Sequence, residues 1–231
     1  MNEPFAWTIT GVERDTGVNL LARSATLLDD PKPLLRWYVP TDATIVLGRG
    51  QRAAHEVPGF NQVVRPSGGG AVRLDPGLLS LDVVIPAGHP WTQGRHLADV
   101  FIPVGQAWLR ALAMLGVPEL SLWEGAATAT RLGTPEQAAL AEVCYASMGR
   151  GEIATGNQKL VGLSQRQRRG GALVQCGIAH HWDPSPLIDA MGVHEAQSAI
   201  WAAATGIDDV LGRSVDDQSI IDAVNQAFTT K

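Results

Sequence analysis

VRPSGGGAVRLDPG, residues 64–77, leads directly into LLSLDVVIP, residues 78–86. In LLSLDVVIP the apolar residues at 79, 81, 83 and 85 alternate with the residues between them, which is the period of a β-strand. NQVV, residues 61–64, is also typical of a strand. Three consecutive glycines leave the backbone without Cβ atoms, so its N–H groups can approach a ligand and φ can be positive. The pattern predicts a glycine-rich connection at the edge of a sheet. Taken alone, such a turn is most often an ordinary surface hairpin.

Further strand patterns occur on both sides of this stretch. LLRWYVP (34–40) and ATIVLG (43–48) are predicted strands. Residues 152–182 predict strands joined by turns at Thr155-Gly156-Asn157 and Arg169-Gly170-Gly171. Strands first, hairpin connections and interspersed helices predict an α+β fold of largely antiparallel β-sheets flanked by helices.

Helical patterns lie between and after the strands. Residues 96–116 form the longest predicted helix; Gly116 is its expected end, and Pro103 is expected to kink it or delay its start. Residues 125–140 are poor in large apolar side chains and predict a mobile loop with a short helix. The last helix is predicted to be capped by Ser214. Its expected inner face consists of Ile220, Ile221, Val224 and Phe228.

Length and composition limit the classes of protein to which this chain can belong. A chain of 231 residues with 45% hydrophobic residues can bury one full core, and we expect a single large domain over residues 1–231, with two small domains as the alternative. A net charge of −5 argues against electrostatically driven nucleic-acid binding. No apolar run is long enough for a membrane span, and the N-terminus lacks the pattern of a signal peptide. Two cysteines are too few for a disulfide framework, so a reducing cytoplasm is the expected compartment.

Three motifs together resemble one enzyme family. Residues 65–72, RPSGGGAV, followed by Asp75 and Gly77, resemble the lipoate-binding loop of the lipoate–protein ligases, octanoyltransferases, lipoyl amidotransferases and biotin–protein ligases. Residues 159–166, KLVGLSQR, resemble that family's second motif, and residues 45–51, IVLGRGQ, resemble an earlier strand and turn. The resemblance implies the fold of a biotin/lipoate protein ligase catalytic domain. It assigns substrate binding to Arg65, Ser67, Gly68, Gly69, Gly70, Ala71, Val72, Asp75, Gly77, Gly162, Ser164 and Gln165.

Cys144 has two interpretations. An arbitrary cysteine is usually a small buried hydrophobe. In the cysteine-dependent members of the family, however, the acyl-accepting cysteine lies just before the hairpin that carries the lysine motif, which is where Cys144 stands. The resemblance therefore implies that Cys144 is the nucleophile, because a thiolate can divide one acyl transfer into two steps through a thioester.

Lys159 also has a simple alternative, that of a solvated lysine at a strand end. Within the motif, the resemblance implies that its ammonium donates to the acyl carbonyl and stabilises the oxyanion during transfer. The family's ATP-dependent ligases use a lysine here as well. Lys159 therefore supports the family without fixing the reaction.

Several other polar residues carry weaker signals. Cys176 is expected to be a buried structural cysteine; a disulfide with Cys144 would require Cα atoms within about 7 Å. His180 and His181 are adjacent and would point to opposite faces of a strand, so we assign no metal site. A basic cluster on the second hairpin is either a solvated turn or a docking site for an acidic carrier domain. It consists of Arg166, Arg168 and Arg169.

The chain also departs from the family pattern. Val64 stands where octanoyltransferases and ligases have a first arginine, and Leu74 stands where they have a histidine. A single arginine before the loop is more similar to the lipoyl amidotransferases. Asp82 occupies a position where serine is common. We expect no C-terminal accessory domain of the kind that many lipoate ligases append, and this expectation favours transfer over ATP-dependent ligation.

The resemblance implies a cytoplasmic acyltransferase of protein lipoylation. It would move an octanoyl or lipoyl group through a Cys144 thioester onto a lysine of a lipoyl carrier domain, of the glycine cleavage H protein or 2-oxoacid dehydrogenase E2 type. Acyl carrier protein is a further candidate partner, and neither nucleic acid nor membrane is expected. Transfer would need no cofactor. The first alternative is an ATP- and Mg-dependent lipoate–protein ligase or its catalytic subunit; the second is a non-catalytic binder of lipoate, octanoate or biotin.

Overall fold

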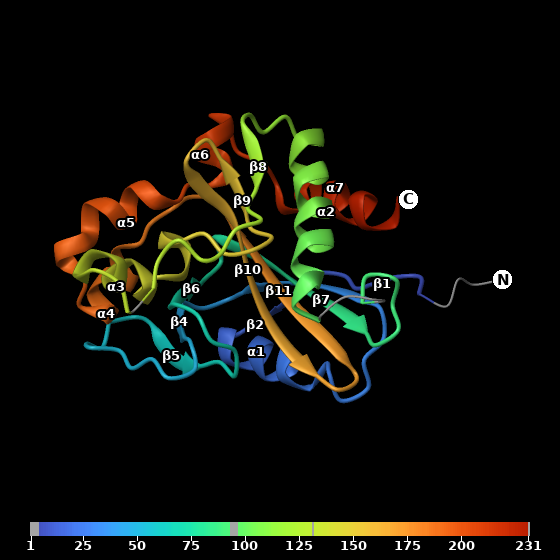
Figure 1. Cartoon of the computed structure of the whole chain (residues 1–231), viewed down its shortest axis with the longest axis horizontal. Helices are drawn as coiled ribbons and strands as arrows, with labels where there is room; N and C mark the ends of the chain where they lie inside the picture. The colour runs from blue at the N-terminus through green and yellow to red at the C-terminus, as the bar shows by residue number, and fades with distance from the viewer. Residues whose placement is uncertain (1–4, 93–96, 131, 231) are drawn as a thin grey trace.

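The computed structural model describes residues 5–92, 97–130 and 132–230, and within them shows two β-sheets surrounded by helices (Figure 1). Seven strands of the larger sheet follow the order β1-β3-β7-β11-β10-β9-β8, and β2 also pairs with β3. Only the pairs that β3 makes with β1 and β2 are parallel among the described strands of this sheet. The α+β prediction is confirmed. The strand bounds are β1 Thr8–Ile9, β2 Glu13–Asp15, β3 Leu34–Pro40, β7 Leu78–Pro86, β8 Leu120–Leu122, β9 Ile153–Thr155, β10 Gln158–Arg168 and β11 Gly171–Ala179.

The smaller sheet contains three strands in the order β5-β4-β6. Its strands are β4 Thr44–Leu47, β5 Asn61–Val64 and β6 Val72–Leu74. The glycine loop, which we define as residues 65–71, connects β5 to β6. Both strands pair with β4, so the loop emerges from one edge of this sheet, as the glycine-rich pattern predicts.

Helices cover both faces of the larger sheet. In Figure 1, α2 and α7 lie on one face and α1 lies below the other, while α3, α4 and α5 gather beside the smaller sheet. None of the helices in the described ranges is long and apolar enough to cross a membrane. The helices are α1 Gly17–Thr26, α2 Phe101–Met114, α3 Pro135–Glu142, α4 Ser185–Met191, α5 Gln197–Ala203, α6 Ile207–Leu211 and α7 Asp217–Thr229, with 3₁₀ turns η1 Leu97–Val100, η2 Cys144–Ala146 and η3 His194–Ala196.

The alternation of β7 decides which side chains face the two layers. Its odd-numbered residues, such as Leu81 and Val83, are buried in the core formed with α2 and α7. Its even-numbered residues face the other way, and the Asp82 carboxylate accepts a hydrogen bond from Ser24 of α1. Successive side chains of a strand point to opposite faces, so this register leaves Ser80 on the α1 side.

Two helix predictions need correction. The long helix α2 starts at Phe101 after η1, and His96 lies outside the described residues. Pro103 therefore falls in the first turn, where a missing N–H costs no helical hydrogen bond. The predicted Ser214 cap is wrong, because α7 starts later and the Asp216 side chain accepts from Ser219 N. The predicted inner face of α7 is buried as expected.

Candidate active site

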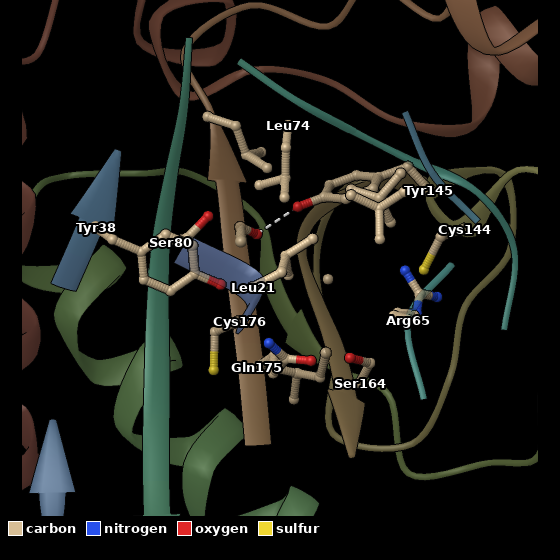
Figure 2. Close-up of a pocket in the computed structure, with 16 residues that line it drawn as sticks. Leu21, Tyr38, Arg65, Leu74, Ser80, Cys144, Tyr145, Ser164, Gln175 and Cys176 are labelled. Atoms are coloured by element: carbon tan, nitrogen blue, oxygen red, sulfur yellow. Dashed lines mark hydrogen bonds between the residues drawn. The ribbon is translucent and has the colours of Figure 1, made fainter. Parts of the chain in front are cut away.

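A pocket opens between α1, the smaller sheet and the α1-facing side of β10 and β11 (Figure 2). It encloses about 500 Å³ of atom-free space, counting the part open to solvent. Five predicted site residues line it: Arg65, Val72, Cys144, Gly162 and Ser164. The other lining residues are Leu21, Tyr38, Val46, Leu74, Leu78, Ser80, Tyr145, Leu163, Gln175, Cys176 and Gly177.

Arg65 holds the glycine loop in shape. Its side chain is 6% exposed, and Nη2 donates to the carbonyls of Gly68 at 3.0 Å and Gly70 at 2.8 Å. Gly69 adopts φ +96°, a conformation that side-chain-bearing residues rarely adopt. The loop is thus curled around a guanidinium that also forms part of the pocket wall.

The glycine loop lies directly against the segment that carries Cys144. Ala71 N donates to the Glu142 carbonyl at 2.7 Å, and Cys144 N donates to the Ala71 carbonyl at 2.9 Å. A Cβ on Gly70 would lie 2.5 Å from Cys144 N, closer than real Cβ atoms approach. Absence of a side chain at Gly70 is therefore what brings loop and cysteine together.

The early motif, residues 45–51, contacts both the glycine loop and the segment that precedes Cys144. Gln51 is buried, and its Oε1 accepts from Gly48 N at 2.8 Å. Its Nε2 donates to the Glu142 carbonyl at 3.0 Å, two residues before Cys144. A Cβ on Gly48 would lie 2.0 Å from the Gly69 carbonyl oxygen. The glycine loop can therefore lie this close to β4 only because residue 48 has no side chain.

Tyr145 forms the wall next to Cys144. Its hydroxyl donates to the Gly177 carbonyl at 2.5 Å, and burial raises its pKa well above the ordinary value. A Cβ on Gly162 would lie 3.0 Å from the Tyr145 ring. Gly162 therefore lets the ring pack flat against β10, and the ring stacks on Trp182 with centroids 5.4 Å apart.

Lys159 is buried, contrary to the alternative of a solvated strand end. It is 1% exposed, and Nζ donates to the carbonyls of Cys144 at 2.9 Å and Ser147 at 3.0 Å. The third partner of Nζ is Glu152 Oε1 at 2.6 Å. The ammonium thus lies beneath the Cys144 segment and does not line the pocket. Its role as oxyanion donor stays a prediction, and that role requires exchange of one of these contacts.

Polar groups close the side of the pocket opposite Cys144. Tyr38 and Ser80 lie there in Figure 2, across from Cys144 and Arg65. Behind them Asp82, which is fully buried, accepts from Gln175 Nε2 at 3.2 Å.

The unusual Asp82 has a partner that explains it. Arg36 Nη1 lies 2.8 Å from Asp82 Oδ2, and Arg36 also donates twice to Glu13 at 2.8 Å. Burial raises the pKa of Asp82, while Ser24 and Arg36 favour its charged form. The network connects α1 and β2 to strands β3 and β7 beneath the pocket.

The remaining predicted binding residues lie around the pocket rather than in its wall. Ser67 is buried and lines a neighbouring cavity, where its Oγ has no hydrogen-bond partner within the described part of the chain. Gly68 and Gly69 are exposed at the loop tip. Asp75 accepts from Gly77 N at 2.8 Å in the turn between β6 and β7. Gln165 is the neighbour of Ser164 on β10, so strand alternation turns it to the other face.

The two cysteines are free, so no disulfide joins them. Cys176 is 3% exposed, and burial raises the pKa of its thiol, as expected for a structural cysteine. His180 and His181 do not diverge as predicted, because they follow the end of β11 and both face Asp208. Across the described ranges, no group of three or more His, Cys, Asp or Glu side chains could hold a metal ion.

The basic cluster on the β10–β11 hairpin is largely engaged. Arg166 donates to the Ala25 carbonyl at 2.8 Å, and Arg168 pairs with Asp29. Both contacts tie the hairpin to the C-terminal end of α1. Carrier docking at this cluster stays a prediction.

Comparison with known proteins identifies the family. Residues 20–229 match the family described as the lipoyl protein ligase A/B catalytic domain. The chain belongs to this family. Membership in the lipoate/biotin ligase superfamily of catalytic domains, which the three motifs predict, is thereby confirmed.

Relatives of this lipoyl protein ligase A/B domain include octanoyltransferases. It is 29% identical to octanoyltransferase LipM of Moorella thermoacetica, over 93% of this chain and 84% of that protein. It is 31% identical to octanoyltransferase LipM of Carboxydothermus hydrogenoformans, over 63% of this chain and 52% of that protein. A crystal structure of lipoate-protein ligase A bound with ATP superimposes with a TM-score of 0.70 at 20% identity, over 95% of this chain and 82% of that one. That likeness concerns the fold.

Sequence reasoning missed several residues of the lipoyl protein ligase A/B site. Tyr38, Ser80 and Gln175 line the pocket from strands that were predicted without a facing direction. Glu152 had a usable signal. In the structure the hairpin pairs Lys159 with Ala154, which places Glu152 two positions further along on the same face, and the turn predicted at residues 155–157 already brings the two segments side by side.

Proposed function

We propose that this chain is an octanoyltransferase of protein lipoylation that carries its acyl group as a thioester on Cys144. The observation that carries the proposal is a half-buried thiol at the edge of a pocket walled by the glycine loop and β10. The similarity of the chain to proteins named octanoyltransferase supports the same reaction class.

The chemistry needs two displacements. The Cys144 thiolate attacks the carbonyl of an octanoyl or lipoyl donor; a bond to sulfur forms, and the donor's thiol or amine leaves with a proton. The ε-amine of a carrier-domain lysine then attacks the Cys144 thioester, an amide forms, and the cysteine sulfur regains its proton. No cofactor is consumed. A thioester donor is already activated, and with an amide donor one amide bond is exchanged for another.

The pocket provides binding energy for the chain. Leu21, Val46, Val72, Leu74 and Leu78 supply apolar surface for an eight-carbon acyl group. Each CH₂ removed from water contributes about 0.8 kcal/mol. Arg65 and the glycine loop would then hold the acyl carbonyl end close to Cys144.

The partners that fit this reaction are proteins carrying acyl groups on flexible arms. Lipoyl carrier domains of the H-protein or E2 type would be acceptors, and an octanoyl–acyl carrier protein or an octanoylated carrier domain would be the donor. We assign the reaction to a reducing cytoplasm, where a catalytic thiol stays free, and to one catalytic domain over residues 1–231.

Intact mass spectrometry tests the proposal. The protein is incubated with octanoyl–acyl carrier protein, with an octanoylated lipoyl domain, or with lipoate, ATP and Mg. We expect a hydroxylamine-sensitive gain of one octanoyl group with a carrier donor, its loss in Cys144→Ala, and its retention in Cys176→Ala. Absence of an adduct with every carrier, together with ATP-dependent transfer that survives Cys144→Ala, would establish a ligase instead.

A further inference from the structure

A buried ion pair supports the Cys144 segment from below. Glu152 and Lys159 side chains are 4% and 1% exposed, and Glu152 Oε1 lies 2.6 Å from Lys159 Nζ. Removing one partner of a buried pair leaves an uncompensated charge, which is strongly destabilising. The two side chains therefore form one unit, although only Lys159 belongs to a recognised motif.

The pair is connected to the backbone on every side. The two remaining Lys159 protons bind the carbonyls of Cys144 and Ser147. Glu152 Oε1 also accepts from Leu163 N at 3.0 Å, and Oε2 accepts from Gly149 N at 2.5 Å. Four backbone groups, three on the segment 144–149 and one on β10, are thus fixed by two side chains.

These contacts join the nucleophile to the pocket wall. Leu163 lies on β10 between Gly162 and Ser164, and all three residues line the pocket together with Cys144. Other contacts of the Cys144 segment reach different elements: Cys144 N donates to Ala71, the Tyr145 hydroxyl donates to Gly177, and Met148 N donates to Thr128. The Glu152–Lys159 pair connects this segment to Leu163 of β10, so it should help to set where the Cys144 sulfur stands relative to a bound acyl chain.

We propose that Glu152 is a positioning residue for acyl transfer. Held by two backbone N–H groups, it fixes the Lys159 ammonium, and the ammonium fixes the backbone of Cys144 and Ser147. When Lys159 exchanges a carbonyl contact for an arriving acyl carbonyl, Glu152 keeps the ammonium in place. The inference rests on the proposed Cys144 thioester.

Substitution Glu152→Gln tests this role, with Glu195→Gln as the matched control at an exposed carboxylate. An amide keeps the acceptor for Lys159 and Leu163 N but presents an NH₂ group to Gly149 N. We expect a folded protein whose single-turnover rate of octanoyl adduct formation falls roughly 10- to 100-fold, as misplacement of a reacting group by about 1 Å does. The donor KM should stay within about 3-fold of wild type, since the pocket wall is intact.

The double variant Glu152→Gln/Lys159→Met separates positioning from general stability. It removes both buried charges, so it should fold even where Glu152→Gln does not. We expect it to lose no more rate than Lys159→Met alone, because residues that act as a unit are non-additive. A folded Glu152→Gln protein with the wild-type rate, or a double variant whose losses multiply, overturns the inference. If the wild type itself forms no adduct, the proposed function fails rather than the role of Glu152.

Discussion

The two thiols of the chain lie in different surroundings, and their accessibility to an acyl donor differs accordingly. Cys144 is half-buried beside the glycine loop, where an acyl carbonyl can reach its sulfur. Cys176 also borders the pocket, but its side chain is turned into the core with Trp108, and burial keeps its thiol protonated. Since the thiolate is the reactive form, the buried Cys176 is unsuited to a thioester mechanism, and Cys144 stays the predicted nucleophile.

A single methyl group at Gly70 should separate the glycine loop from Cys144. In Gly70→Ala the new Cβ would meet Cys144 N at 2.5 Å and Val143 C at 2.7 Å, and backbone atoms cannot rotate away. We expect a loss of unfolding free energy of about 1–3 kcal/mol and a fall in adduct formation of at least about 10-fold. Gly68→Ala is the control, because nothing lies within 4 Å of its Cβ position. Equal rates for both variants would show that this contact is unimportant.

At the scale of elements, period and turn chemistry placed the longer strands but missed the short strands β1, β2, β6 and β8. The predicted strands at 34–40 and 78–86 coincide with β3 and β7, and both predicted turns of residues 152–182 join strands. Alternation also separates Ser164 from Gln165, but the sequence does not say which face α1 covers. The family resemblance assigned Gln165 to the site together with Ser164, although only Ser164 lines the pocket.

Helix boundaries depend on local competition that a sequence leaves open. Ser214 and Asp216 are both good caps, and Asp216 is the one whose side chain accepts from Ser219 N, at 2.8 Å. We expect Asp216→Ala to lower the melting temperature by roughly 2–4 °C, the usual effect of losing one cap in a chain of this size. Ser214→Ala should leave it unchanged. Thermal unfolding followed by circular dichroism decides, and the reverse order of the two variants would restore the Ser214 prediction.

At the scale of the whole molecule, the site forms where segments distant in the chain meet. Motifs predicted the glycine loop, Cys144 and Lys159 separately. What joins them are backbone contacts such as Ala71 with Glu142 and Cys144, which depend on the packing of η2 against the smaller sheet. Such long-range contacts leave no periodic signal. Gln175 and Tyr38 were missed for the same reason.

The stability of the contact between the C-terminal helices and the sheet should depend on pH through His180. At the end of β11, its Nε2 lies 2.9 Å from Asp217 on α7 and its Nδ1 lies 3.3 Å from Asp208 on α6; Asp217 also pairs with Arg14 of β2. The hydrogen bond to Asp217 raises the pKa of His180 above its ordinary value, although burial opposes this. A raised pKa in the folded state means that the stabilisation is complete below the unfolded value of about 6.5 and is lost as pH rises through the folded value.

We therefore expect the difference in unfolding free energy between wild type and His180→Asn to be largest below about pH 6.5 and to shrink as the pH rises above that value. Comparison with a variant cancels the titration of groups elsewhere in the chain. His181→Asn is the matched control, since its side chain is 70% exposed although it lies 2.7 Å from Asp209. Solvent screening should leave the His181–Asp209 pair with only a small contribution to the unfolding free energy. Urea titrations across this range measure both differences. A His180 difference that is constant, or that grows as pH rises, would mean that the imidazole binds these carboxylates in its neutral form and that its positive charge does not hold the helices to the sheet.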